Sequence, residues 1–255
     1  MGNTYAIINQ KGGVGKTTSV ANIGAALANK GKKILLIDID PQANLGSHYG
    51  IIIDETKDMF SMYDVLCKEF PLKDLIVEIN DNLHLAPSGI YLSGAELELA
   101  ATIGREFKLK NAIKTISNTY DIIFIDCPPS LGVLTQNALV ASTGAIIPVQ
   151  SEYLALNGVD QLLTTIGIVR DSYNPSLLVT GAFISMFNSK RRLDKSVAES
   201  LKEYFGEVLF KTIIRENVTL AEAPAQGTSV YELDSNSNGA ADYNSLADEI
   251  IERDM

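Results

Sequence analysis

The stretch that decides the fold is NQKGGVGKTTS, residues 9–19. It follows a short apolar run, residues 5–8, and leads into a segment with helical spacing that begins at about Thr17. Its glycines let backbone N–H groups curl toward one point, the helix N-terminus adds partial positive charge, and Lys16 adds a full one. This strand–loop–helix pattern is typical of a polyphosphate site in which the Thr17 hydroxyl can bind Mg²⁺. A glycine-rich turn without a ligand is the alternative, but it does not explain the complete Gly-Lys-Thr-Thr ending.

The rest of the chain alternates strand-length apolar runs with helix-length periodic segments. Strands are predicted at residues 5–8, 33–37, 83–86, 121–125, 145–149, 177–184 and 208–214. Helices are predicted at residues 17–29, 104–117, 158–173, 196–204 and 240–252. Nearly continuous apolar strands that alternate with helices predict an α/β fold, with a mainly parallel, twisted sheet and helices on both faces. No linker or repeat divides the chain, so we predict one domain over residues 1–255.

Composition excludes several classes of protein. The chain has 255 residues, of which 46% are hydrophobic, and only two cysteines, too few for a disulfide framework. No leader precedes the first apolar run, and no apolar stretch reaches the roughly 18 residues of a membrane span. These features favour a reducing, cytoplasmic compartment and no membrane partner. The net charge is −10, but residues 232–255 hold seven acids against one base, so a local basic face remains possible.

Acidic residues follow two of the predicted strands. Asp38 and Asp40 come at the end of one strand, and Asp126 comes at the end of another. Ligands of open parallel sheets bind at the carboxyl ends of strands, so these acids should converge on the glycine-rich loop. We predict that Asp126 holds Mg²⁺ through a water and that Asp38 supports the metal shell. The alternative for each acid is a helix cap or a loop residue, and for Asp38 the strand-end placement is the only local argument.

The loop departs from the common phosphate-loop pattern in one informative way. G-x-x-x-x-G-K-[ST] requires glycine at position 10, but this chain has Gln10 followed by Lys11. The resulting KGGVGKTT resembles the deviant loop of the ParA/MinD branch of P-loop ATPases. That resemblance implies that Lys11 reaches across a homodimer to the ATP bound by the second copy, and that Asp40 positions the attacking water. It implies catalytic roles for Lys11, Lys16 and Asp40. The implied nucleotide-binding loop is Lys11, Gly12, Gly13, Val14, Gly15, Lys16, Thr17 and Thr18.

Further segments extend this resemblance over nearly the whole chain. IDIDPQANLGSHYGI, LSGAELELA, YDIIFIDCPPSLGVLTQNALVAS, IIPVQSEYLALNGVDQLL and VTLAEAPAQGTSV occur in the order found in short ParA proteins of the Soj type. The resemblance implies an ATP- and Mg²⁺-dependent switch that is monomeric without ATP and dimeric with it. It also implies slow hydrolysis, stimulated by a ParB/Spo0J-like activator during chromosome or plasmid partition. The cytoplasmic protein would then associate with the nucleoid.

Short ParA proteins also bind DNA without sequence preference. The candidate contacts here are Lys190, Arg191, Arg192, Lys195 and Arg215. A solvated helix start is the alternative for the cluster at residues 190–195. This chain also has Glu216 and Thr219 where Soj-type proteins usually have arginine, which must weaken a phosphate-binding face there.

Two residues are candidates for contacts with adenine. Asn188 follows a predicted strand where related ATPases place a polar residue against the base, and Pro224 lies in the segment that flanks it. A loop-capping role for Asn188 is equally consistent with the sequence.

Three other functions remain open. A related positioning ATPase could carry another cargo, and a MinD-type ATPase would bind membrane through its C-terminal helix, although that segment is acidic here. A biosynthetic or nitrogenase-reductase-like protein could hold an iron–sulfur cluster, for which Cys127 lies near the expected nucleotide but Cys67 lies in a helix-like segment. His48 and His84 lack the spacing of metal ligands, so no chemistry is assigned to them.

Overall fold

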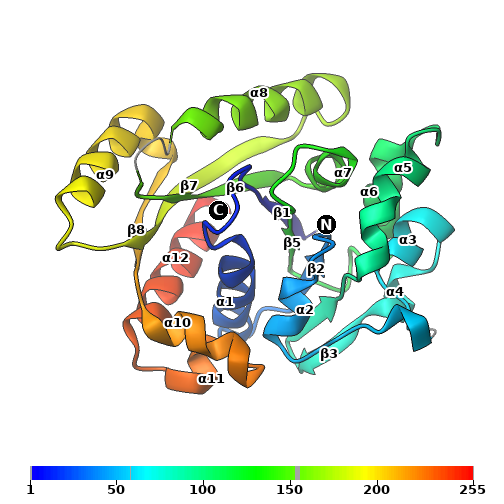
Figure 1. Ribbon diagram of the computed structural model, residues 1–255, viewed down its shortest axis with the longest axis horizontal. Coiled ribbons are helices and arrows are strands. Elements are labelled where there is room, and N and C mark those ends of the chain that lie inside the picture. Colours follow the sequence, from blue (N-terminus) through cyan, green and yellow to red (C-terminus); the bar gives the residue numbers. More distant parts are fainter. Residues whose placement is uncertain (1, 58, 153–155, 255) are drawn as a thin grey trace.

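A twisted sheet runs through the centre of the molecule (Figure 1). In the part of the chain that the computed structural model describes, residues 2–57, 59–152 and 156–254, eight strands form this sheet in the order β3-β4-β2-β5-β1-β6-β7-β8. The strands are β1 (Asn3–Ile7), β2 (Ile34–Asp38), β3 (Val77–Asn80), β4 (Leu83–Ala86), β5 (Ile122–Asp126), β6 (Gly144–Gln150), β7 (Leu178–Phe187) and β8 (Leu209–Arg215). Neighbouring strands are parallel, apart from β3, which is antiparallel to β4. The predicted α/β class is confirmed.

Helices cover both faces of the sheet. The α-helices are α1 (Lys16–Asn29), α2 (Asn44–His48), α3 (Met62–Lys68), α4 (Leu72–Leu75), α5 (Ala95–Leu99), α6 (Lys108–Lys114), α7 (Val133–Ala141), α8 (Asn157–Ser172), α9 (Arg192–Phe205), α10 (Val218–Glu222), α11 (Val230–Asp234) and α12 (Asn238–Asp254). Short 3₁₀ helices are η1 (Glu55–Lys57), η2 (Ile90–Gly94), η3 (Arg105–Phe107), η4 (Gly206–Val208) and η5 (Ala223–Gln226). Among the described helices, none is both long and apolar enough to cross a bilayer.

Two hydrophobic cores form, one on each face of the sheet. Successive side chains of a strand point to opposite faces, so Leu35 and Ile37 of β2 join one core while Ile34 and Leu36 join the other. One core packs the sheet against α3, α5, α6, α7, α8 and α9, and the second packs it against α1, α11 and α12. The predicted strands read as continuous apolar runs because both of their faces are buried.

The structure differs from the sequence prediction mainly at edges and helix ends. Strand β3 was not predicted, because its residues are largely exposed at the edge of the sheet and show no continuous apolar run. Helix α9 begins at Arg192 instead of residue 196. The helix predicted over residues 104–117 is divided into η3 and α6. Helix ends often tighten into 3₁₀ turns, and local periodicity does not report this.

Strand register brings three chain segments to one edge of the sheet. Asp126 at the end of β5 is the register partner of Ile7 in β1 on one side and of Asp38 in β2 on the other. The loops that follow β1, β2 and β5 therefore leave the sheet next to one another. This places the glycine-rich loop beside both groups of predicted acids, as expected at the carboxyl edge of a parallel sheet.

Candidate nucleotide site

The glycine-rich loop between β1 and α1 is fixed from both sides. Gly13 and Gly15 have φ angles of 75° and 87°, in the left-handed region that only glycine adopts without strain. Ser185 of β7 donates a hydrogen bond to the Val14 carbonyl at 2.8 Å, and Asn9 donates to the Pro148 carbonyl at 2.7 Å. The loop is thus held open before any ligand binds, which lowers the entropy lost on binding.

The two lysines of the loop have different surroundings. Lys16 is buried and lines a cavity of ≈ 750 Å³ together with Gly12, Gly13, Gly15, Thr17, Thr18 and Asp40. Burial lowers the pKa of Lys16, although the carboxylates of Asp126 and Asp40 oppose this effect. Lys11 does not line the cavity; its side chain is 45% exposed, and its Nζ lies 2.5 Å from the carboxylate of Glu152. Lys16 can therefore bind a phosphate within the chain, whereas Lys11 faces outward.

Asp126 and Thr17 form the candidate metal-binding pair. The Thr17 hydroxyl donates a hydrogen bond of 2.6 Å to Asp126 Oδ2, while the buried Oδ1 has no partner among the described residues. Burial raises the pKa of Asp126 to about 7, with a further rise from the charge of Asp40, and the Thr17 and Lys16 contacts oppose it. A buried carboxylate with one free oxygen, next to a hydroxyl, is suited to a hard cation such as Mg²⁺.

Asp38 holds the backbone of the following loop. Its two carboxylate oxygens accept hydrogen bonds from the backbone N–H groups of Asp40, at 2.9 Å, and Leu45, at 3.1 Å. Burial raises the pKa of Asp38 well above its usual value, and the charge of Asp126 adds to the rise. These contacts match the loop-residue alternative; whether Asp38 also supports a metal shell stays a prediction. Asp40 lines the cavity, and its Oδ1 accepts from the Gln42 N–H at 3.0 Å.

Several lining residues were not predicted from the sequence. The cavity is also lined by Gln42, Asn44, Ser47 and His48 from the α2 region and by Pro129, Met186, Ala221 and Ala225. Burial lowers the pKa of His48 to about 4, so its imidazole is neutral near pH 7. The sequence around His48 did not predict that it lines the cavity, because the folding of the α2 segment against the loop brings it there.

The two residues predicted to contact adenine occupy different places. Pro224 in η5 lines the cavity. Asn188 does not line it; its side chain accepts from the Lys190 N–H at 3.0 Å and donates to Glu216 at 2.9 Å. Asn188 therefore caps its own loop in this structure, and its contact with a base stays a prediction.

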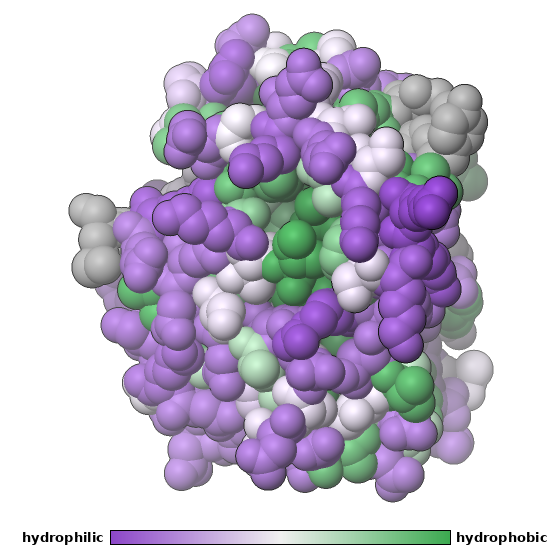
Figure 2. Space-filling model, turned by 90° about the vertical axis from the view of Figure 1, so that its left-hand side faces the viewer, coloured by the Kyte–Doolittle hydropathy of each residue, from purple (hydrophilic) through white to green (hydrophobic). Residues whose placement is uncertain are grey.

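The predicted DNA-binding residues separate into two groups. Arg191 pairs with Glu216 at 3.1 Å, and Arg215 makes a bidentate contact with Asp242 at 2.6–3.1 Å. Lys190, Arg192 and Lys195 have no acidic partner in the described part of the chain and lie at or just before the start of α9. Figure 2 looks onto the side of the molecule that carries α9 and β8, where hydrophilic side chains dominate the surface.

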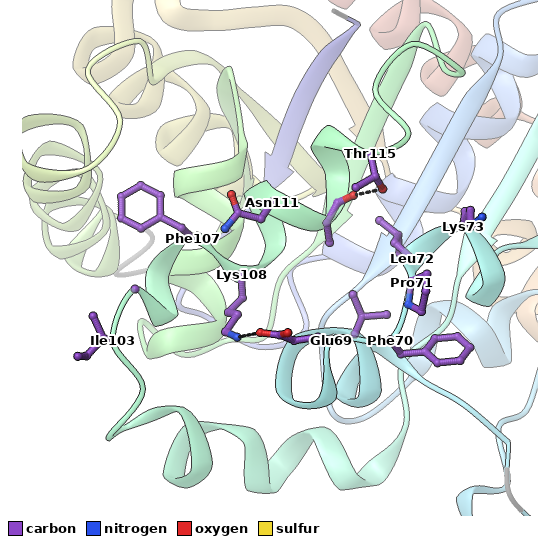
Figure 3. A pocket seen from close by; sticks show the side chains of 13 residues that line it. Glu69, Phe70, Pro71, Leu72, Lys73, Ile103, Phe107, Lys108, Asn111 and Thr115 are labelled. Carbon is purple, nitrogen blue, oxygen red and sulfur yellow. Dashed lines mark hydrogen bonds and ion pairs between the residues drawn. The ribbon is translucent and has the colours of Figure 1, made fainter.

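A second large cavity lies between the α3–α4 segment and α6, on the face of the sheet opposite α1 (Figure 3). Its volume is ≈ 670 Å³, and Phe70, Ile103 and Phe107 contribute apolar wall. Its charged groups are Glu69, Lys73 and Lys108, of which Lys108 and Glu69 pair at 2.8 Å. It lacks the glycine-rich loop and the buried carboxylates, so the cavity at the loop is the better candidate for chemistry.

Neither cysteine belongs to a cluster of potential metal ligands in the described part of the chain. Cys127 is fully buried and Cys67 packs in α3, and burial raises the pKa of both thiols, that of Cys67 to about 11. Within the described residues, His, Cys, Asp and Glu side chains do not gather in threes around a common point. Such a cluster is not needed for Mg²⁺ at a phosphate loop, since one carboxylate, a hydroxyl and the phosphates suffice.

Comparison with known proteins decides the family. Residues 2–179 match the family model of the AAA domain. The sporulation initiation inhibitor protein Soj of Bacillus subtilis is 45% identical over 98% of both chains. The chromosome-partitioning ATPase Soj of Treponema pallidum is 43% identical over 100% of this chain and 99% of its own. The chain belongs to the Soj/ParA family of ATPases. It is therefore an ATPase of this family.

Solved structures of relatives support the nucleotide site of this Soj/ParA homologue. Cobyrinic acid a,c-diamide synthase from Mycobacterium smegmatis, with bound ADP and magnesium, superimposes with a TM-score of 0.86 at 35% identity, over 99% of this chain and 95% of that one. A putative plasmid partition protein from Borrelia burgdorferi, bound to AMPPNP, gives a TM-score of 0.83 at 29% identity over the full length of both. Nucleotide and Mg²⁺ thus occur in structures of this family.

The residues of this chain fit a magnesium–nucleotide complex. The unpartnered Oδ1 of Asp126, the adjacent Thr17 hydroxyl and a pKa raised by burial all mark a place where a cation would relieve unfavourable charge. The open loop and the buried ammonium of Lys16 provide the complementary surface for phosphates. Asp40 lies on the same cavity wall, where a carboxylate can orient a water molecule.

Proposed function

We propose that this chain is an ATP-dependent dimerisation switch that acts in DNA partition. The observation that carries the proposal is the separation of the two loop lysines. Lys16 lines the cavity, whereas Lys11 points outward on the same loop and is half exposed. A second copy that faced this loop could receive Lys11 at its own nucleotide, as the family resemblance implies. ATP and Mg²⁺ would then be enclosed between the two copies.

Each residue of the site has a role in this proposal. The loop and Lys16 bind the phosphates, and Thr17 with Asp126 would hold Mg²⁺, which neutralises charge on the phosphates during transfer. Asp40 orients the attacking water, and its loop is kept in place by the hydrogen bonds to Asp38. Lys11 of the second copy adds positive charge where the transition state gains negative charge. Because this charge arrives only on dimerisation, hydrolysis depends on assembly.

Partner binding follows from the same family relationship. Several relatives are named for chromosome partition, so we propose a ParB/Spo0J-like activator and DNA bound without sequence preference. Of the predicted DNA contacts, Lys190, Arg192 and Lys195 have no acidic partner among the described residues and are free to contact phosphates, and a dimer doubles them. The switch would work in the cytoplasm on the nucleoid surface.

The membrane-binding alternative meets a structural obstacle. Helix α12 buries Tyr243, Leu246 and Ile250 against the sheet, and Arg253 near its end donates hydrogen bonds to the carbonyls of Thr180 and Val208. Its apolar face is therefore already used in the core. An amphipathic membrane anchor needs that face free.

Light scattering after size exclusion tests the proposal. With Mg²⁺ and ATP, Asp40→Ala is expected to elute as a stable dimer that hydrolyses poorly, because its site binds but cannot orient water. Lys16→Ala is expected to bind no nucleotide in calorimetry and to stay monomeric. Lys11→Ala should bind ATP but lose turnover stimulated by the activator. A monomeric Asp40→Ala protein at saturating nucleotide would refute the dimer.

A further inference from the structure

A smaller cavity, here called the side cavity, opens beside the phosphate loop. Its volume is ≈ 250 Å³, and it is bounded by the ends of β7 and β8, by α10 and by α12. It shares Gly15, Thr18, Met186 and Ala221 with the nucleotide cavity. A molecule whose phosphates lie on the loop can therefore extend its other end into the side cavity.

The side cavity has both apolar and polar walls, and Thr18, Gln150, Ser185 and Asn217 are among its polar residues. Met186, Ile214 and Leu220 contribute aliphatic and thioether surface, and Tyr243 contributes an aromatic ring. Cavities of this kind accept flat rings by contact, while a few polar groups at the rim decide which ring is preferred. Specificity for one ring must therefore come from the polar and charged groups of the lining.

The cations at this rim are already paired. Arg215 is bound by Asp242 through its backbone N–H at 2.9 Å and through its guanidinium at 2.6–3.1 Å. Arg191 lies 3.1 Å from Glu216. Among the charged groups that line the side cavity, the carboxylate of Glu216 is the hydrogen-bond acceptor, and its two oxygens offer about four acceptor sites.

Neighbouring groups fix the position of Glu216. Its backbone N–H donates to the Phe187 carbonyl at 3.0 Å, and its side chain accepts from Asn188 at 2.9 Å and from Arg191. These contacts tie the carboxylate to the loop after β7. A carboxylate accepts hydrogen bonds and donates none, so it favours a ring edge that carries an N–H donor.

We propose that Glu216 determines base specificity by accepting a hydrogen bond from the exocyclic 6-amino group of adenine. This inference rests on the proposed function, since it requires that the triphosphate lie on the loop. It gives Asn188 a positioning role, because Asn188 orients the carboxylate instead of touching the base.

Binding of two nucleotides tests the proposal. The probes are the magnesium complexes of ATP and of purine riboside 5′-triphosphate, which is ATP without the 6-amino group, measured by calorimetry in the absence of DNA. The unmodified protein should prefer ATP by about tenfold, the low end for a hydrogen bond to a charged group, because the Glu216 side chain is 51% exposed. Glu216→Ala should bind the two nucleotides with about equal affinity. Glu216→Gln should restore part of the ATP preference, since the amide oxygen still accepts.

Glu222→Ala is the matched control. Glu222 is an exposed acid in α10 that does not line the side cavity, so this variant should keep the ATP preference of the unmodified protein. An unchanged ATP preference in Glu216→Ala, with ATP still bound, overturns the proposal. Equal binding of both probes by the unmodified protein overturns it as well. Failure of the unmodified protein to bind either probe would instead overturn the proposed function.

Discussion

Asp126→Asn should stabilise the protein in the absence of metal, and by more at high pH than at low pH. The carboxyl of Asp126 is fully buried, and its pKa in the folded chain is raised to about 7, from 3.8 for an ordinary aspartate. The unfolded chain therefore releases this proton at lower pH than the folded chain does. Between about pH 4 and pH 7 the folded state binds more protons, so stability falls as the pH rises. The neutral amide of asparagine removes this loss and still accepts from Thr17.

The size of the effect follows from the two pKa values. Each pH unit between them corresponds to about 1.36 kcal/mol, so the ionised carboxylate lowers the free energy of unfolding by about 4 kcal/mol at pH 8. At pH 5.5, where the folded group is protonated, the loss is about 2 kcal/mol. The advantage of asparagine should therefore grow by about 2 kcal/mol between these pH values.

Urea unfolding at pH 5.5 and pH 8, with a chelator present, measures this difference. Glu203→Gln removes an exposed acid of α9 and should show no pH-dependent gain. With saturating Mg²⁺ and ATP, the unmodified protein should become more stable to urea than Asp126→Asn, because only the carboxylate is stabilised by the cation. An asparagine variant whose advantage is the same at both pH values would refute the argument that burial holds a proton on Asp126.

Two further predictions concern long-range ion pairs. Glu152→Ala should release Lys11 from its ion pair. An exposed pair contributes about 0.2–1 kcal/mol, so with two pairs per dimer the ATP-dependent dimer should form at roughly two- to thirtyfold lower concentration in sedimentation experiments. Unchanged dimerisation would show that the pair does not compete with assembly. Glu216→Gln removes the negative charge that pairs with Arg191 and should strengthen DNA co-sedimentation. The salt dependence of binding should become steeper by about one phosphate contact per protomer. Glu203→Gln removes the same charge without freeing an arginine, so an equal gain there would contradict a specific role for the pair.

The local pattern of residues predicted the fold and the centre of the site. Apolar runs of strand length, buried on both faces, were sufficient to predict the parallel sheet, because such runs are stable only between two helical layers. The glycines of the loop and one predicted strand-end acid, Asp40, line the cavity, as expected at the carboxyl edge of a parallel sheet. The exposed edge strand β3 was missed because its residues carry no such pattern.

Only the tertiary structure decided which charges are free. Lys11 and Glu152 are 141 residues apart, Arg191 and Glu216 are 25 apart, and Arg215 and Asp242 are 27 apart. Each pair joins elements that the strand order and the crossover connections bring together. The periodic pattern of residues along the sequence does not predict such long-range contacts. The basic cluster near residue 190 therefore looks uniform in the sequence, yet in the folded chain Arg191 is neutralised and its neighbours are not. Periodicity determines which side chains are buried, whereas the partner of a surface charge depends on how distant segments pack.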